Sequence, residues 1–165
     1  MTLQVIKEVD HPTGLTRKML KLPVHFYRLG LGRLFGDRLL MVNHWGRVTG
    51  KRYQTVVEVI RHEERDDSYL IASGWGPGAD WYRNLLRRPR TTVEVDGQTK
   101  QVTAEPLPAE EATEIMTGYF WRHRAVAKRM LPRLYGYWVD GSKADFHEVA
   151  ERVPVLRLAP ARPAH

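Results

Sequence analysis

The sequence contains no cysteine, which excludes disulfide bonds, thiolate nucleophiles and cysteine-ligated metal sites. No apolar stretch approaches the roughly 20 residues that a membrane-spanning helix needs. The first residues show neither the charged start nor the apolar middle of a signal peptide. We therefore expect a cytoplasmic protein and leave open an association with the inner face of the membrane.

Motifs for several common chemistries are also missing. We find no nucleophile elbow, no Walker loop and no Rossmann fingerprint. The 7 histidines show no pair at the spacing of metal ligands, so the sequence predicts no metal site. These absences do not exclude an enzyme, because a bound cofactor can carry the reaction where the protein has no catalytic constellation of its own.

Length and composition predict one folded domain over residues 1–165. The chain is 42% hydrophobic, which suffices for a real core at this length. Within it we expect an N-terminal helical segment over 1–36 and a loose tail over 160–165. The net charge is +7, from 26 Lys and Arg against 19 Asp and Glu, and predicts an anionic partner such as nucleic acid, lipid head groups or a phosphorylated cofactor.

The hydrophobic pattern predicts an α+β fold built around a barrel-like antiparallel sheet. Strands are expected at 39–43, 55–62, 68–73, 91–95, 98–104 and 153–158, and helices at 81–88, 109–120 and 145–150. Residues 15–35 have a helical pattern that Pro23 interrupts, so we expect two short helices there or one that starts at Pro23. Asp80 is expected to cap the helix that follows it. The helical segment at 15–35 has an apolar stripe with basic residues beside it. Such a helix either covers the core or rests on an anionic membrane surface.

The stretch 46–57 is predicted to form a hairpin tip with a positive charge. It lies between two β-rich runs and reads Gly-Arg-Val-Thr-Gly-Lys-Arg-Tyr-Gln-Thr-Val-Val. Such a tip offers backbone N–H groups, a threonine hydroxyl and cationic side chains, which together favour phosphates and carboxylates. An ordinary solvated turn is the alternative interpretation.

Several short motifs occur in a fixed order along the chain. Gly-Arg-Val-Thr-Gly at 46–50 precedes Thr-Val-Val-Glu-Val at 55–59, and Ser-Gly at 73–74 precedes Ala-Asp-Trp-Tyr-Arg-Asn-Leu at 79–85. A Val-x-Val strand then ends at the Asp-Gly turn of 96–97. This order and spacing resembles the deazaflavin (F420)-dependent nitroreductase family from about Leu22 to Leu158.

The resemblance implies a split β-barrel like that of FMN-binding and pyridoxamine-phosphate-oxidase-like proteins, with six antiparallel strands and flanking helices. It implies coenzyme F420 as the cofactor. The tip and the glycine-rich loop would hold the acidic tail of F420, and the strand at 55–57 would lie behind its ring. The cofactor-binding positions carried over are Arg47, Val48, Thr49, Gly50, Lys51, Tyr53, Thr55, Val56, Val57, Ser73, Gly74, Trp75, Gly76, Trp81 and Asn84.

The chain departs from this family pattern at three positions. Many members carry basic residues where this chain has Val48, Tyr53 and Gly74, so the cationic grip on a charged tail is weaker. Lys51 and Arg52, or alternatively Arg83, are candidates to compensate. FMN is the alternative cofactor, and a barrel that has lost its redox function is a further alternative.

The implied reaction is hydride transfer from the reduced deazaflavin to a small apolar electrophile: an activated alkene, a quinone or a nitro compound. Tyr119, Tyr135 and Tyr137 are candidates for the proton donor or for lining the pocket; as an alternative, they are core aromatics. We expect a homodimer and no nucleic-acid partner. In the competing hypothesis, the arginine-rich stretches 83–90 and 121–133 make the protein a nucleic-acid or membrane-surface binding module.

Overall fold

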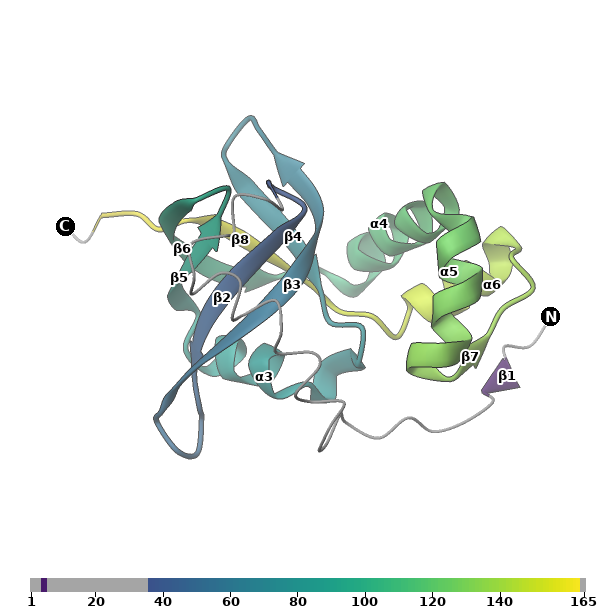
Figure 1. Ribbon diagram of the computed structural model, residues 1–165, viewed down its shortest axis with the longest axis horizontal. Coiled ribbons are helices and arrows are strands. Elements are labelled where there is room, and N and C mark those ends of the chain that lie inside the picture. The colour runs from purple at the N-terminus through teal and green to yellow at the C-terminus, as the bar shows by residue number, and fades with distance from the viewer. Residues whose placement is uncertain (1–3, 6–35, 164–165) are drawn as a thin grey trace. The chain divides into compact units, whose positions relative to one another are not determined.

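The computed structural model describes residues 4–5 and 36–163 (Figure 1). The helical segment predicted at 15–35 lies outside these residues. The chain divides into two compact units, which we describe separately. The barrel unit comprises Pro12–Ala72, Gly78–Pro106 and Leu156–His165, and the helical unit comprises Met1–His11, Ser73–Pro77 and Leu107–Val155. That the two units form one domain stays a prediction.

Six antiparallel strands close into a barrel in the order β2-β3-β4-β8-β6-β5. Their bounds are β2 (Leu39–Trp45), β3 (Arg52–Glu63), β4 (Ser68–Ala72), β5 (Arg90–Val95), β6 (Gln98–Pro106) and β8 (Val155–Pro160). All six predicted strands are present, and the prediction of a six-stranded antiparallel barrel is confirmed. Closure leaves the barrel without the exposed strand edges that promote aggregation.

The barrel interior follows from the two-residue alternation of side chains along a strand. Val42 lies opposite Thr55 on one neighbouring strand and opposite Val93 on the other. Both valines are completely buried, so this face of β2 and β5 points inward. The remaining interior residues include Leu40, Val95, Val102, Ala104, Leu156 and Leu158.

The first hairpin is longer than the hydrophobic pattern predicted. β2 continues past Asn43 to Trp45, and β3 already begins at Arg52, which pairs with Trp45. The connecting tip is therefore confined to residues 46–51. Gly50 adopts a φ of +66°, a left-handed conformation that glycine accepts without steric cost.

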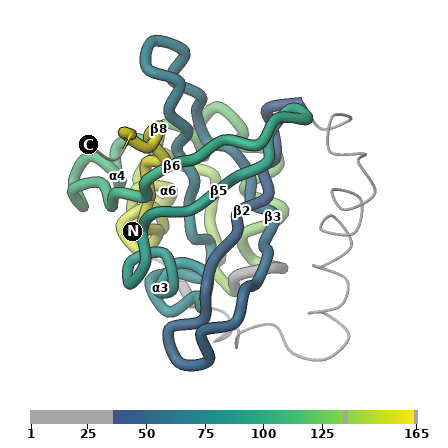
Figure 2. Tube along the Cα trace, turned by 90° about the vertical axis from the view of Figure 1, so that its left-hand side faces the viewer, coloured from purple at the N-terminus to yellow at the C-terminus, as the bar shows by residue number. Residues whose placement is uncertain are grey.

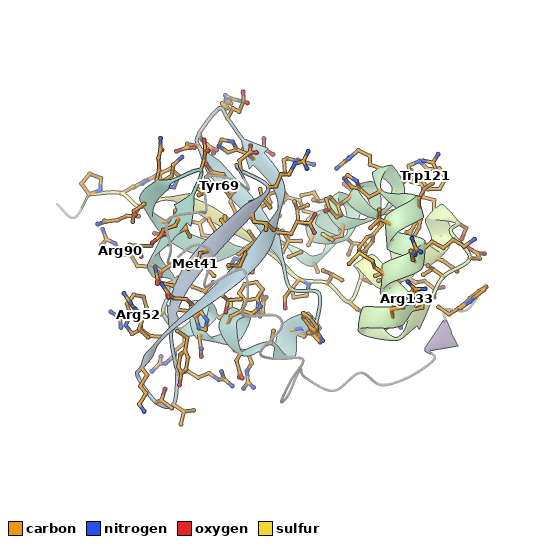
Figure 3. All side chains as sticks on the ribbon, viewed as in Figure 1. Met41, Arg52, Tyr69, Arg90, Trp121 and Arg133 are labelled. Atoms are coloured by element: carbon orange, nitrogen blue, oxygen red, sulfur yellow. The ribbon has the colours of Figure 1, made fainter. Side chains whose placement is uncertain are left out.

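A clasp of polar side chains closes the β3–β4 turn. The Lys100 ammonium donates to both oxygens of Asp67, at 2.9 and 2.8 Å, and His62 lies 2.9 Å from the same carboxylate. The His62 ring stacks on Tyr69 with 4.2 Å between centroids. The hydrogen bond from Lys100, opposed by partial burial, holds the pKa of Asp67 below its usual value. In Figure 3, Tyr69 and Arg52 lie towards opposite ends of the barrel.

The helical unit contains α4 (Ala109–Arg122), α5 (Arg124–Met130), the π-helical turn η3 (Leu131–Tyr135) and α6 (Lys143–Ala150). A short pair of strands, β1 (Gln4–Val5) and β7 (Tyr137–Trp138), adds to it. Its core packs Phe120 against the fully buried Phe146, with 6.1 Å between ring centroids. Met116 and Val149 are buried in the same unit.

Helix α6 begins before the residue at which we predicted its start. Ser142 occupies the N-cap position, and its hydroxyl accepts a hydrogen bond from the Asp145 N–H at 3.2 Å. The Asp145 carboxylate in turn accepts the Asp140 N–H at 2.9 Å. The Ser142 hydroxyl thus satisfies a donor of the first helical turn, which explains the earlier beginning.

None of the helices in the described part of the chain has both the length and the apolar content required to span a membrane.

Candidate functional site

The candidate site begins with helix α3 (Asp80–Arg87), which contacts β2 and β6 and lies beside the β2–β3 tip in Figure 2. The prediction that Asp80 caps this helix is wrong. Ala79 holds the N-cap position and Asp80 is the first helical residue, with its carboxylate directed elsewhere. The Leu85 side chain of α3 is completely buried. The helix face that carries Leu85 therefore packs against the rest of the barrel unit.

Arg47, at the tip, is bound to this helix by three hydrogen bonds. Its backbone N–H and its guanidinium both donate to the Asn84 carbonyl oxygen, each at 3.0 Å. A second guanidinium nitrogen forms a 3.0 Å ion pair with Asp80. The Arg47 side chain is 25% exposed and that of Asp80 is 80% exposed. The cation is thus fixed by a buried partner, whereas its carboxylate partner lies at the surface.

Asn84 also connects the tip to a buried histidine on β2. Since its carbonyl oxygen faces two donors from Arg47, its amide nitrogen faces His44 Nδ1 at 3.0 Å and donates to it. His44 Nδ1 must then be an acceptor, and the ring proton resides on Nε2. That nitrogen lies 3.0 Å from the Thr55 hydroxyl and donates to it. This assignment of the tautomer follows from the hydrogen-bond network.

Burial keeps His44 uncharged. Its side chain lies on the inward face of β2, and the residue is 5% exposed. Desolvation lowers the pKa of His44 to about 4, and the negative charge of Asp80 opposes this shift in part. A neutral imidazole is the form that the contacts with Asn84 and Thr55 require.

The tip itself is closed by short contacts that only glycine permits. A Cβ on Gly46 would collide with the Thr49 hydroxyl and would lie 3.0 Å from the Tyr53 ring. The Thr49 hydroxyl lies 3.1 Å from the Tyr53 hydroxyl and accepts the Lys51 N–H at 3.3 Å. Gly46 therefore allows the threonine and the tyrosine to pack over the backbone of the tip.

Basic side chains surround this end of the barrel unit. Lys51 and Arg52 are exposed on the hairpin, and Arg83 and Arg87 are exposed on α3. The Arg88 guanidinium lies 4.3 Å from the centroid of the Trp45 ring. Figure 3 places Arg52 at this end of the barrel. Val48, which replaces a basic residue of the family pattern, is 89% exposed and makes the middle of the tip apolar.

The strand predicted to back the cofactor ring presents its side chains on two faces. Thr55 and Val57 pair with Val42 and Leu40 and therefore point to the barrel interior. Val56 pairs with Met41 and points to the outer face. A ligand on the outer face can contact the Val56 side chain, and it can reach only the backbone of Thr55 and Val57.

The other predicted cofactor-binding segment, Ser73–Gly76, belongs to the helical unit. The Ser73 hydroxyl donates to the Gly76 carbonyl at 2.6 Å, and the Gly76 N–H returns a hydrogen bond to the Ser73 carbonyl at 2.9 Å. Ser73 is buried, while Gly74 and Trp75 are partly exposed. In this conformation the hydroxyl closes the loop, so it is not available to donate to a ligand.

The predicted aromatic residues differ in their surroundings. On α3, Trp81 is partly exposed and meets the buried Tyr82 edge to face at 6.1 Å. In the helical unit, Tyr119 is partly exposed and packs on His123 at 4.7 Å, and the Arg152 guanidinium lies 5.9 Å from the Tyr137 ring. The side chain of Tyr135 lies outside the described residues.

Two residues of this site were not predicted from the sequence. No role was predicted for His44, because the histidines show no metal-ligand spacing and the predicted strand ends at Asn43. A longer β2 would have placed His44 on the inward face, because Leu40, Val42 and His44 are two residues apart and point to the same side of the strand. The pairing of Asp80 with Arg47 gave no signal in the sequence, since the two residues belong to different elements.

Comparison with known proteins identifies a family over most of the barrel unit and part of the helical unit. The family model described as F420H(2)-dependent quinone reductase matches residues 21–132. No curated protein gives a significant match.

Solved structures share the fold at low sequence identity. A protein of unknown function from Agrobacterium tumefaciens, Atu2129, has a TM-score of 0.50 and 16% identity. The match covers 93% of this chain and 58% of the Atu2129 chain. An F420-H2 dependent reductase, FDR-A, has a TM-score of 0.46 and 17% identity over 74% of this chain and 95% of that one. A pyridoxamine 5'-phosphate oxidase-related, FMN-binding protein from Nostoc punctiforme has a TM-score of 0.49 and 9% identity, over 90% of this chain and 81% of that one. The fold is the predicted split β-barrel.

The buried neutral His44 makes stability depend on pH in a defined window. Because its pKa is lowered in the folded state from 6.5 to about 4, its full contribution is present above pH 6.5 and is lost as the pH falls towards 4. The loss amounts to about 3 kcal/mol for this shift. Chemical denaturation of wild type and His44→Gln at several pH values will measure it, since glutamine can make both hydrogen bonds but does not titrate.

We expect His44→Gln to flatten the pH dependence of the free energy of unfolding between pH 6.5 and 4. His147→Gln, on an exposed face of α6, serves as the control and should leave it unchanged. The carboxyl groups with lowered pKa, Asp66, Asp67 and Asp140, begin to lose their stabilising contribution at about pH 5. They do so equally in wild type and variant, so the difference between the two pH profiles isolates His44. An unchanged slope in His44→Gln would show that His44 is not the group that titrates.

Proposed function

Because the chain belongs to the F420H2-dependent quinone reductase family, we propose that it is an oxidoreductase that reduces a quinone with reduced coenzyme F420. The family match carries this proposal, since it spans the tip, five of the six barrel strands and α3 together. Activated alkenes and nitro compounds are the other acceptors of the same chemical kind. When bound, the reduced deazaflavin supplies the hydride.

The donor set at the tip fits the acidic tail of such a cofactor. A guanidinium, an ammonium and a hydroxyl lie on Arg47, Lys51 and Thr49 within one short turn. Charge-assisted hydrogen bonds from such groups are the strong ones for phosphate and carboxylate. Arg47 is already held in place by Asn84, so little side-chain freedom remains to be lost when an anion binds.

The partners of Arg47 have different roles in this proposal. Asn84 and the neutral His44 are positioning residues, because they are buried and act on the ligand only through Arg47. Asp80 is exposed and contacts the same guanidinium, so an incoming anionic group competes with its carboxylate. The loss of basic residues at Val48 and Tyr53 leaves Lys51 and Arg52 as the other cations of the hairpin.

The acceptor must also receive a proton, and the candidate donors are in the helical unit. Tyr119 and Tyr137 are both partly exposed and carry a phenol that can donate to a reduced oxygen. Tyr135 stays a candidate from the sequence. A homodimer, and contact of the N-terminal segment with a membrane, likewise stay predictions.

Removing the tip donors tests the binding site directly. We expect Arg47→Ala combined with Thr49→Ala to weaken F420 binding at least tenfold, or by about 1.4 kcal/mol, measured by fluorescence titration. The fold should persist, because the Arg47 backbone N–H still satisfies the buried Asn84 carbonyl. Arg61→Ala combined with Thr99→Ala makes the same chemical change at exposed positions elsewhere on the barrel unit.

The control variant should bind F420 as the wild type does. Equal affinity of the tip variant and the control would remove the tip from the cofactor site. A parallel titration with FMN separates the two cofactors, because FMN carries a phosphate without the longer acidic tail. Wild-type protein that binds FMN but not F420 would contradict the proposed cofactor.

Removing the internal competitor should have the opposite effect. We expect Asp80→Asn to tighten F420 binding by up to about fivefold, the order of magnitude of one surface ion pair. Asp96→Asn removes the same charge from an exposed turn and controls for the general gain in positive charge. Weaker binding by Asp80→Asn than by this control would mean that Asp80 supports the ligand instead of competing with it.

A further inference from the structure

Helix α5 presents an unusual group of exposed apolar side chains. Val126 is 55% exposed, Met130 43%, and Trp121 at the end of α4 40%. Together with Arg122, Arg129 and Arg133 we call these residues the α5 face. Val126 and Met130 are four residues apart in the helical segment and therefore lie on the same side of it. In Figure 3, Trp121 and Arg133 lie near the two ends of α5.

The burial of α5 shows that this face is not needed for the core of the helical unit. Among the residues of α5, only Ala127 is buried. Leu131, directly after the helix, is buried as well, so Ala127 and Leu131 mark the side of this segment that faces the core. Single exposed apolar residues are common on proteins, but Val126 and Met130 lie next to each other on one side of α5, and this pair is the basis for an interaction surface here.

The charge of this segment is of one sign. Residues 121–133 contain five lysines and arginines and no aspartate or glutamate. Within the described ranges, no ion pair joins Arg122, Arg129 or Arg133 to a carboxylate. Lys128 points to another side, where its side chain lies beside Gly141. The pKa of Asp140 is lowered mainly by hydrogen bonds from Ser142, and the charge of Lys128 adds to this effect. The acidic residues of α4, Glu110 and Glu111, are in its first turn, at the other end of that helix.

We propose that the α5 face binds the surface of an anionic lipid bilayer. Apolar side chains with cations beside them on one helix side are the combination that inserts at the boundary of head groups and acyl chains. The arginines are attracted by the negative surface potential, and tryptophan favours the interface because its ring is amphipathic. The attachment is peripheral, through one short helix.

Nucleic acid fits the same face less well. Binding of single strands relies on aromatic platforms for the bases, and here the most exposed apolar side chains are Val126 and Met130, which cannot stack in that way. The one aromatic ring, Trp121, is already covered on one side by the Arg124 guanidinium at 5.1 Å. The charge complementarity is shared by both partners, but the apolar component favours lipid.

Sedimentation with lipid vesicles tests this proposal on the full chain. We expect binding to vesicles of mixed phosphatidylglycerol and phosphatidylcholine and at least tenfold weaker binding to phosphatidylcholine alone. Val126→Asp with Met130→Asp should reduce binding to the anionic vesicles at least tenfold. Arg129→Gln with Arg133→Gln should also reduce it and should lessen its dependence on salt.

Matched controls separate the α5 face from the overall charge and apolarity. Leu86→Asp alters an exposed leucine of α3, and Arg61→Gln with Arg65→Gln removes two exposed charges from the barrel unit. Both controls should bind vesicles as the wild type does. Because Val126 and Met130 are exposed, their variants should unfold at the wild-type temperature. Val126→Gln with Met130→Gln serves as a milder replacement if they do not.

Three results would overturn the proposal. The wild type could show no preference for anionic vesicles, the α5 variants could bind as tightly as the controls, or the protein could bind single-stranded DNA at concentrations where vesicles are not bound. None of these outcomes depends on F420, so they leave the proposed reductase function unaffected.

Discussion

The amide of Asn84 is the contact on which the arrangement of the candidate site depends. Its oxygen accepts two hydrogen bonds from Arg47 and its nitrogen donates to His44. One side chain thereby joins the hairpin tip, helix α3 and the barrel interior. Because an amide has distinct donor and acceptor ends, the direction of every hydrogen bond from Arg47 to Thr55 is determined by it. A buried network of this kind is stable only when each member has its partner.

The barrel explains why this network sits at one end of the hairpin. Strand alternation puts Val42 and His44 on the same inward face, and at the tip end α3 supplies Asn84 as the polar partner of His44. At the other end of the barrel, the clasp of Asp67, Lys100 and His62 satisfies its charges internally. Among the residues that the structure describes, the cations near the tip have no comparable set of carboxylates, apart from Asp80 on Arg47. The two ends therefore differ in their capacity to bind an anion.

The architecture could be predicted from the sequence because local patterns determine it. Alternating apolar residues and the turn at Asp96 specify the strands and their order, and Pro89 marks the end of α3. The candidate site could be predicted only in part: the tip followed from the sequence pattern, and Asn84 from the family resemblance. The contacts of Arg47 with Asp80 and of His44 with Asn84 join elements far apart in the chain, and no local pattern encodes them. The position of Asp80 within its helix was wrong because Ala79 takes the cap position.

The polarity of the Asn84 network also constrains how this site can change during evolution. The acceptor nitrogen of His44 requires a donor at position 84. The side-chain carbonyl of Asn84 in turn requires the backbone N–H of Arg47 to stay in place. A substitution at either buried position that does not supply the same donor or acceptor leaves a polar atom without a partner unless the other position changes with it. Positions 44 and 84 should therefore covary among relatives, while the exposed residues of the tip diverge independently as the ligand changes.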